Sequence, residues 1–175
     1  MNQQNIFLVG LMAVGKSTVG RLLAESLQMP FYDTDIEIES RAGAEVAWIF
    51  DVEGEQGFRD REEQVIDELS QENGIVVATG GGAVKRPANR LHMGGRGTVI
   101  HLDCSLNRLL ARTRKDKKRP LLQGDNREQV LRDLIAERAP LYQEIADYRF
   151  LSEDQSPKTL ASQIRKRLVA DGVVQ

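Results

Sequence analysis

The chain alternates between short runs of apolar residues and longer stretches in which apolar residues recur every three or four positions. Several of the short runs, such as residues 75–78 (IVVA), contain no polar position. Uninterrupted apolar runs of this length are typical of parallel strands that are covered on both faces. The pattern therefore predicts strands at residues 5–9, 30–33, 74–79, 98–103 and 148–152.

The stretches between these runs have the periodicity of amphipathic helices. In the segment 16–27, for example, Val19, Leu23 and Leu27 fall on one helical face. Similar stripes occur at 58–69 and 130–135. Strands that alternate with helices through short connections predict an α/β fold, in which helices cover both faces of a parallel sheet. Ligands of such folds bind beyond the carboxyl ends of the strands.

Three residues set the expected limits of the helix around 130–135. Asp125 precedes Glu128 by three residues, a spacing that is typical of a capping box at a helix start. Pro140 lacks the N–H group that a helix interior requires. We therefore expect this helix to begin near Asp125 and to kink or end at Pro140.

Composition narrows the class of protein. The 175 residues fit a single domain, 1–175, and the 41% hydrophobic and 29% charged residues are ordinary for a soluble protein. The net charge of −2 argues against a dedicated nucleic-acid binder. One cysteine, Cys104, excludes an internal disulfide and favours a reducing compartment. The apolar run 6–14 is too short to span a bilayer, so we expect a cytoplasmic protein.

A phosphate-binding motif follows the first predicted strand. Residues 10–17 (GLMAVGKS) match the P-loop pattern G-x-x-x-x-G-K-[ST], and Thr18 adds a second hydroxyl. The glycines allow backbone N–H groups to point at phosphate oxygens, and the helix that follows directs its positive end at the same anion. Lys16 would meet the β- and γ-phosphates, and Ser17 would bind Mg²⁺. GTPases, ATPase motors and kinases share this loop, so it leaves the reaction open.

Two carboxylates, Asp33 and Asp35, follow the second predicted strand. At that edge of the sheet, one would orient Mg²⁺ and the other would accept a proton from a substrate hydroxyl or hydrogen-bond to it. Aspartate is also a favoured N-cap, so the pair could instead cap a helix that begins near Ile36. The sequence leaves both hypotheses open.

Three consecutive glycines, Gly80 to Gly82, end the third predicted strand. Such a run leaves room for a ligand against the main chain. An isolated triple glycine is usually a flexible turn, but at the carboxyl end of a strand in a P-loop protein we expect the floor of a substrate site. The run contains no acidic residue, so the Walker-B role is expected to fall to the region of Asp33.

Arginines supply the candidate anion ligands. Arg59 precedes Glu62 by three residues, which fits either a surface ion pair of little energetic weight or a pair in which Glu62 orients Arg59 toward a substrate carboxylate. Arg138 is a further candidate, although it could equally be an ordinary surface arginine. Spacing alone does not decide between these alternatives.

The segment 112–119 (RTRKDKKR) is strongly basic. Such runs are usually solvated loops and sometimes nucleic-acid arms, but in a P-loop enzyme they also serve as a lid that carries an arginine to the transferring phosphoryl group. The chain has no guanine-binding N/T-K-x-D string. Together with the arginines, this favours a small-molecule kinase over a GTPase.

Taken together, these motifs resemble those of the shikimate kinase family, a member of the nucleoside-monophosphate-kinase-like P-loop group. The resemblance covers residues 5 to about 168, and no single motif is specific. One departure is Ala13, where many members carry glycine. The segments that carry the resemblance are 10–18, 33–35, 50–62, 80–82, 119–122 and 137–142.

The resemblance implies a three-layer P-loop kinase fold with a five-stranded parallel sheet in the order 2-3-1-4-5. It also implies a substrate-binding helical region at about 34–62 and a mobile lid at about 113–125. The implied substrate ligands are Asp35 near the reacting 3-hydroxyl, Arg59 and Arg138 on the carboxylate, and Gly81. The implied metal ligands are Ser17 and Asp33, and the implied catalytic residues are Lys16, Asp35 and Arg119. The implied ATP-binding residues are Ala13, Val14, Gly15, Lys16, Ser17, Thr18, Arg112, Arg119 and Gln155.

The implied reaction is transfer of the γ-phosphoryl group of ATP to shikimate, with one Mg²⁺ ion, on the route to chorismate and the aromatic amino acids. The resemblance further implies a monomer without nucleic-acid or membrane partners. One alternative is another small-molecule kinase, such as gluconate kinase, which the combination of Arg59, Arg138 and the triple glycine disfavours. A nucleotide-binding module without turnover is disfavoured by the intact Lys16 and Asp35.

Overall fold

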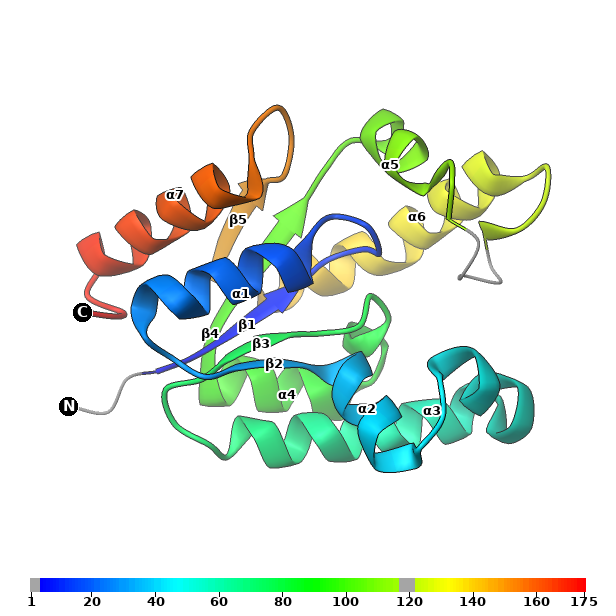
Figure 1. Cartoon of the computed structure of the whole chain (residues 1–175), viewed down its shortest axis with the longest axis horizontal. Helices are drawn as coiled ribbons and strands as arrows, with labels where there is room; N and C mark the ends of the chain where they lie inside the picture. Colours follow the sequence, from blue (N-terminus) through cyan, green and yellow to red (C-terminus); the bar gives the residue numbers. More distant parts are fainter. Residues whose placement is uncertain (1–3, 117–121) are drawn as a thin grey trace.

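The strands form one parallel sheet in the order β2-β3-β1-β4-β5 (Figure 1). The computed structural model describes residues 4–116 and 122–175. The predicted strands are confirmed, and their ends lie within two residues of those expected. Their bounds are β1 (Asn5–Val9), β2 (Phe31–Asp33), β3 (Val76–Ala78), β4 (Gly97–Asp103) and β5 (Tyr148–Leu151).

Helices cover both faces of this sheet, as expected. On one face, α1 (Lys16–Leu27) packs against α7 (Pro157–Ala170) (Figure 1). On the other face, α4 (Pro87–Arg96) lies between α3 (Val46–Ser70) and α6 (Arg127–Ile145). The remaining helices are α2 (Thr34–Ala42), the short 3₁₀ helix η1 (Ala83–Lys85) and α5 (Leu106–Thr113).

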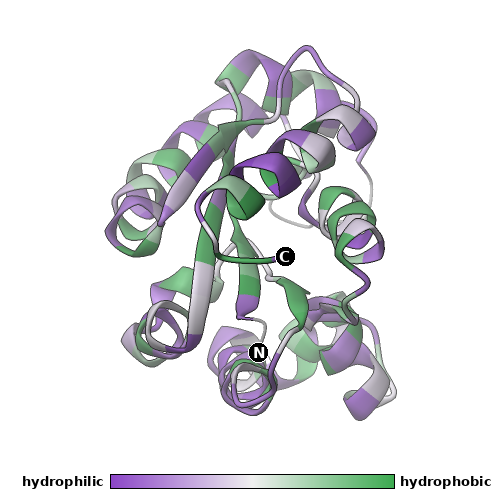
Figure 2. Ribbon diagram, turned by 90° about the vertical axis from the view of Figure 1, so that its left-hand side faces the viewer, coloured by the Kyte–Doolittle hydropathy of each residue, from purple (hydrophilic) through white to green (hydrophobic). Residues whose placement is uncertain are grey.

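The sheet forms the centre of the hydrophobic core. Ile6, Phe7, Leu8 and Val9 of β1 are fully buried, because β3 and β4 flank this strand and helices cover it. Figure 2 shows the same distribution, with hydrophobic strands inside and helices whose residues alternate between hydrophobic and hydrophilic. The absence of polar positions in these strands is thus explained by burial on both faces.

α6 begins at Arg127, within two residues of the expected start, but the expected capping role of Asp125 is wrong. The N-cap is Asn126, which makes no side-chain capping bond, and Glu128 instead pairs with Arg132 at 2.8 Å. The helix does not end at Pro140 but continues to Ile145. An interior proline typically costs about 3 kcal/mol or more. Arg138 and Tyr142 are buried on either side of it, so tertiary packing holds the helix together where local propensity opposes it.

α3 is interrupted at Gly54, which has φ 73° and ψ 177°. This left-handed φ is readily adopted only by glycine. The break separates the segment that begins at Val46 from the longer segment that carries Arg59 and Glu62.

Within the described parts of the chain, no helix has both the length and the apolar character needed to cross a membrane.

Candidate active site

The carboxyl ends of β1, β2 and β3 meet at one edge of the sheet (Figure 1). The strand register places Ala78 of β3 beside both Leu8 of β1 and Asp33 of β2. The P-loop, the acidic pair and the triple glycine each begin within two residues of these positions. Three motifs that are far apart in the sequence therefore converge, as expected for a ligand site in a parallel sheet.

The side chain of Lys16 folds back onto the P-loop. The Lys16 ammonium donates hydrogen bonds to the carbonyls of Gly10 and Leu11, each at 2.7 Å. Gly10 has φ 148°, and a Cβ atom there would lie 2.2 Å from the Leu102 carbonyl oxygen. Gly15 precedes α1 with φ 98°, while Ser17 and Thr18 in the first turn are exposed. The loop thus presents a helix N-terminus, hydroxyls and a cation at one point, which suits a phosphate chain.

Ala13 adopts a left-handed backbone with φ 64°, which explains why glycine is common at this position. An alanine in this conformation costs roughly 1–2 kcal/mol. The neighbouring carbonyls are held in place: Arg112 donates to the oxygens of Ala13 and Val14, both at 3.2 Å, and Ser152 Oγ donates to Val14 O at 2.6 Å. Arg112 also donates to the Ser152 carbonyl at 2.8 Å. Arg112 therefore links the carbonyl groups of the P-loop to Ser152.

The two carboxylate oxygens of Asp33 accept hydrogen bonds from different parts of the chain. Oδ1 accepts from the N–H groups of Asp35 at 3.0 Å and Ile36 at 3.2 Å, so Asp33 caps α2, which begins at Thr34. Oδ2 accepts a hydrogen bond from the Ser17 hydroxyl. The capping hypothesis is thus confirmed for Asp33. The same carboxylate nevertheless remains beside the P-loop hydroxyl.

These oxygens fit a magnesium ion. Mg²⁺ prefers hard oxygen ligands and is commonly bound through one or two protein groups together with water and phosphate oxygens. Ser17 and Asp33 provide one hydroxyl and one carboxylate. The described residues contain no cluster of three or more histidine, cysteine, aspartate or glutamate side chains that could hold a metal. An ion here would therefore take its remaining ligands from water and the nucleotide.

Asp35 has an unusual carboxyl group. Burial, and then the nearby Glu62 and Asp33 carboxylates, raise the pKa of Asp35 to about 6, and Lys16 opposes this shift. A carboxylate with a raised pKa accepts a proton more readily than an ordinary one. Asp35 is therefore suited to act as a base toward a hydroxyl group.

Arg59 and Glu62 form a buried ion pair, so the alternative of a surface pair is wrong. Glu62 is 0% exposed and Arg59 is 8% exposed, and Arg59 Nη1 lies 2.7 Å from Glu62 Oε1. Burial raises the pKa of Glu62, and the guanidinium groups of Arg59 and Arg138 oppose that shift. Arg138 is also buried, at 5% exposed, and its Nε atom has no hydrogen-bond partner among the described residues.

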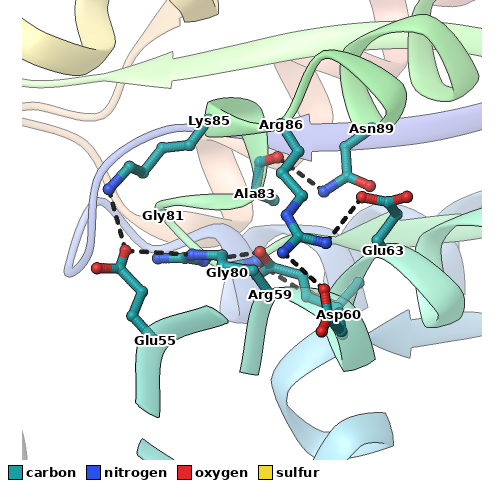
Figure 3. A network of polar contacts seen from close by, with 12 residues as sticks. Glu55, Arg59, Asp60, Glu63, Gly80, Gly81, Ala83, Lys85, Arg86 and Asn89 are labelled. Atoms are coloured by element: carbon teal, nitrogen blue, oxygen red, sulfur yellow. Dashed lines mark hydrogen bonds and ion pairs between the residues drawn. The ribbon is translucent and has the colours of Figure 1, made fainter. Parts of the chain in front are cut away.

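An outer network fixes this pair against η1 (Figure 3). Glu55 lies between Arg59 and Lys85, with its oxygen 3.5 Å from Arg59 Nε and 3.0 Å from Lys85 Nζ. Arg86 pairs with Asp60 at 2.7 Å and with Glu63 at 3.0 Å. Sequence reasoning missed Lys85 and Arg86, and the only signal was their position just after the triple glycine.

The three glycines allow the site side chains to approach the main chain. None of them has a positive φ, so conformational freedom is not the reason for glycine here. A Cβ atom at Gly80 would lie 2.9 Å from Asp35 Oδ1, and one at Gly81 would lie 3.3 Å from Arg138 Nη1. At Gly82 it would lie 2.2 Å from Arg59 Nη2. Each glycine therefore makes room for a different charged side chain of the site.

Gly82→Ala should displace Arg59, because the added methyl group would overlap its guanidinium. We expect the KM for the acceptor substrate to rise by about tenfold, as for loss of a charged hydrogen bond, and the KM for the nucleotide to change little. Gly95→Ala on α4 is the matched control, since its Cβ would meet nothing within 4 Å. Equal kinetic constants for the two variants, measured at steady state, would contradict this role of Gly82.

Of two further residues predicted to bind ATP, the structure describes Gln155 but not Arg119. Gln155 lies in the loop after β5, and its side-chain amide donates to the Leu151 carbonyl at 3.1 Å. Arg119 and residues 117–118 of the basic segment lie outside the described residues. The roles of Gln155 and Arg119 therefore stay predictions.

A parallel sheet of this order, with a phosphate loop after its first strand and an acidic residue beside that loop, defines a P-loop kinase fold. A sequence model described as shikimate kinase matches residues 12–169. The chain belongs to the shikimate kinase family.

Individual relatives agree with this assignment. The chain is 57% identical over 166 residues to a shikimate kinase of Vibrio campbellii, covering 95% of this chain and 96% of the relative. It is 56% identical over 163 residues to a shikimate kinase 1 of Yersinia enterocolitica, covering 93% and 94% of the two chains. It superposes with a TM-score of 0.93 on the shikimate kinase of Acinetobacter baumannii in complex with shikimate, which is 46% identical, over 97% of this chain and 94% of the other.

Proposed function

We propose that this chain transfers the γ-phosphoryl group of ATP to the 3-hydroxyl of shikimate, giving shikimate 3-phosphate and ADP. The observation that carries this proposal is the pair of buried guanidinium groups of Arg59 and Arg138 beside the triple glycine, at the same sheet edge as the P-loop. Buried cations require anionic partners. Glu62 supplies one buried negative charge for these two guanidinium groups, so the site favours a second anion. The carboxylate of a hydroxylated acid would supply it, together with a hydroxyl for Asp35.

On the nucleotide side, the P-loop binds and orients the phosphates. Its N–H groups and the start of α1 would face the phosphate oxygens, and Lys16 would leave the Gly10 and Leu11 carbonyls for the β- and γ-phosphates. Arg112 and Ser152 fix the loop through hydrogen bonds to the Val14 carbonyl. We also assign Ala13, Val14, Gly15, Thr18 and Gln155 to the ATP site.

On the acceptor side, Asp35 would hydrogen-bond to the 3-hydroxyl and take its proton as the oxygen attacks the γ-phosphorus. Glu62 holds Arg59 in orientation through its 2.7 Å contact. Arg59 and Arg138 would then fix the carboxylate, and Gly81 would allow the ring to lie close to the main chain. Phosphoryl transfer requires little covalent chemistry from the protein, so orientation and charge stabilisation account for most of the catalysis.

Ser17 and Asp33 would hold one Mg²⁺ ion, which would neutralise charge on the phosphates as they react. We further propose that residues 34–62 form the substrate-binding region and that residues 113–125 form a lid carrying Arg119 to the phosphoryl group. Exclusion of water by such a lid would prevent wasteful hydrolysis of ATP. We propose that the chain acts as a cytoplasmic monomer.

Replacement of Arg59 or Arg138 by lysine should be costly although the charge is kept. Lysine offers a point charge in place of the planar fork that binds a carboxylate bidentately. We expect the KM for shikimate to rise by roughly 10- to 100-fold, with a small change in kcat. Arg132→Lys, an exposed position on the same helix as Arg138, is the matched control. A normal KM in both site variants would show that neither arginine contacts the substrate.

The proposed function as a whole is tested by a coupled assay of ADP release with a panel of hydroxylated acids and neutral polyols. Shikimate should give the highest kcat/KM, and its carboxamide should be a poor substrate. If gluconate or a neutral polyol were preferred, the kinase assignment would stand but the substrate would be wrong.

A further inference from the structure

Tyr142 on α6 is buried beside the proposed substrate site without a role in the chemistry described above. Its side chain is 2% exposed, and its ring stacks on His101 of β4 with the centroids 4.9 Å apart. Its hydroxyl donates a hydrogen bond to the carbonyl of Gly81. Tyr142 thus connects α6 to the glycine floor that follows β3.

The hydroxyl, rather than the ring, distinguishes this residue. A phenylalanine would fill the same space against His101, and burying a phenolic hydroxyl is unfavourable unless it is hydrogen-bonded. The compensating bond is made to Gly81, which lies close to both the P-loop and Arg138. A Cβ there would lie 3.2 Å from the Met12 amide nitrogen in the P-loop and 3.3 Å from Arg138 Nη1. Small movements of Gly81 would therefore disturb both sides of the site.

The continuation of α6 through Pro140 makes this contact possible. Arg138 and Tyr142 are four residues apart, so they lie on the same face of the helix, one turn from each other. A helix that ended at Pro140 would not hold Tyr142 in this alignment. Burial raises the pKa of Tyr142 far above its usual value, and Arg138 opposes the shift. The hydroxyl therefore keeps its proton and remains a donor throughout the neutral range.

We propose that Tyr142 is a positioning residue for the acid substrate. Through its hydroxyl, it fixes the Gly81 main chain relative to the Arg138 guanidinium. The distance between this part of the triple glycine and the group that would bind the carboxylate is thereby kept constant. This inference rests on the proposed function. It assigns to Tyr142 a part in selecting the acid, and no part in binding the nucleotide.

The test is Tyr142→Phe, which keeps the ring and removes only the hydroxyl. We expect the KM for shikimate to rise by about three- to tenfold, the factor for loss of one hydrogen bond. The KM for ATP and kcat should change less than about twofold, because the P-loop and Asp35 keep their own contacts. Tyr148→Phe is the matched control, since that hydroxyl contacts exposed Asp171 at 2.8 Å and lies away from the site. It should leave all three constants unchanged.

A second measurement separates positioning from a purely structural role. If Tyr142 acts through Arg138, Tyr142→Phe should raise the KM for the shikimate carboxamide by a smaller factor than the KM for shikimate. The reason is that Arg59 and Arg138 bind the amide poorly in either protein. A lower melting temperature with an unchanged shikimate KM would overturn the inference. So would an equal rise in the KM values for ATP and shikimate. Wild-type protein that did not phosphorylate shikimate would instead refute the proposed function, so the two failures are distinguishable.

Discussion

Replacing Asp35 with asparagine is expected to lower kcat by about 10²- to 10⁴-fold, the usual contribution of a general base. The amide keeps the size of the side chain but cannot accept the hydroxyl proton. The affinity for ATP should remain nearly unchanged, because the contact with Ser17 belongs to Asp33. Steady-state kinetics with varied ATP and shikimate measure both quantities. Asp51→Asn, at an exposed position on α3, is the control.

The same variant should be more stable than the wild type at neutral pH. The pKa of Asp35 is raised from 3.8 to about 6 in the folded protein, so folding favours the protonated form. Below about pH 4 the carboxyl is protonated in both the folded and unfolded states, and the substitution should then have little effect on the free energy of unfolding. Between pH 4 and 6 the unfolded chain releases the proton first, so the wild type loses stability as the pH rises.

Thermal unfolding of the ligand-free proteins at about pH 3 and at about pH 7.5, on either side of both pKa values, measures this difference. The expected result is a higher melting temperature for Asp35→Asn at pH 7.5 only. In the wild type, kcat/KM should also fall as the pH drops through about 6, since the base becomes protonated. A loss of ATP affinity equal to the loss of kcat would instead place Asp35 at the metal and reverse its role with that of Asp33.

Replacing Lys16 with alanine is expected to reduce kcat by about 100-fold or more. The ammonium lies within the P-loop itself, where it is held by two carbonyls, and alanine removes the charge that would face the transferring phosphoryl group. The fold should persist, because the strand before the loop and the apolar face of α1 are unchanged. Circular dichroism checks the fold, and single-turnover kinetics at saturating ATP measure the chemical step. Lys158→Ala, on the exposed surface of α7, should retain normal turnover. Near-normal turnover of folded Lys16→Ala would contradict the assignment of the P-loop.

The fold was predictable from the sequence because its signals are local. Apolar runs without polar positions mark buried parallel strands, and the P-loop links the first of these strands to a helix. The convergence of the P-loop, Asp33 and the glycines followed from the general rule for strand ends in parallel sheets. The apolar pattern alone leaves the order of the strands open, and the family resemblance supplied that order.

Other features depend on tertiary contacts that spacing does not reveal. The sequence left Arg59 and Glu62 as either a surface or a buried pair, because three-residue spacing fits both, and the burial of Glu62 decides between them. Helix capping and a role at the metal or substrate were weighed as alternatives for the acidic pair, whereas the Asp33 carboxylate caps α2 and also contacts Ser17 of the P-loop. Pro140 was expected to kink or end α6, and the helix does not end there, since the packing of Arg138 and Tyr142 outweighs the local cost of proline.

The central claim, transfer of the γ-phosphoryl group to the 3-hydroxyl of shikimate, is tested most directly by identifying the labelled product. The protein is incubated with Mg²⁺, shikimate and ATP that is isotopically labelled in its γ-phosphoryl group, and the products are analysed by mass spectrometry and phosphorus NMR. The account predicts one labelled phosphate monoester on the 3-hydroxyl for each ADP formed. Formation of ADP without label in the acid, or label at a different hydroxyl, would contradict it.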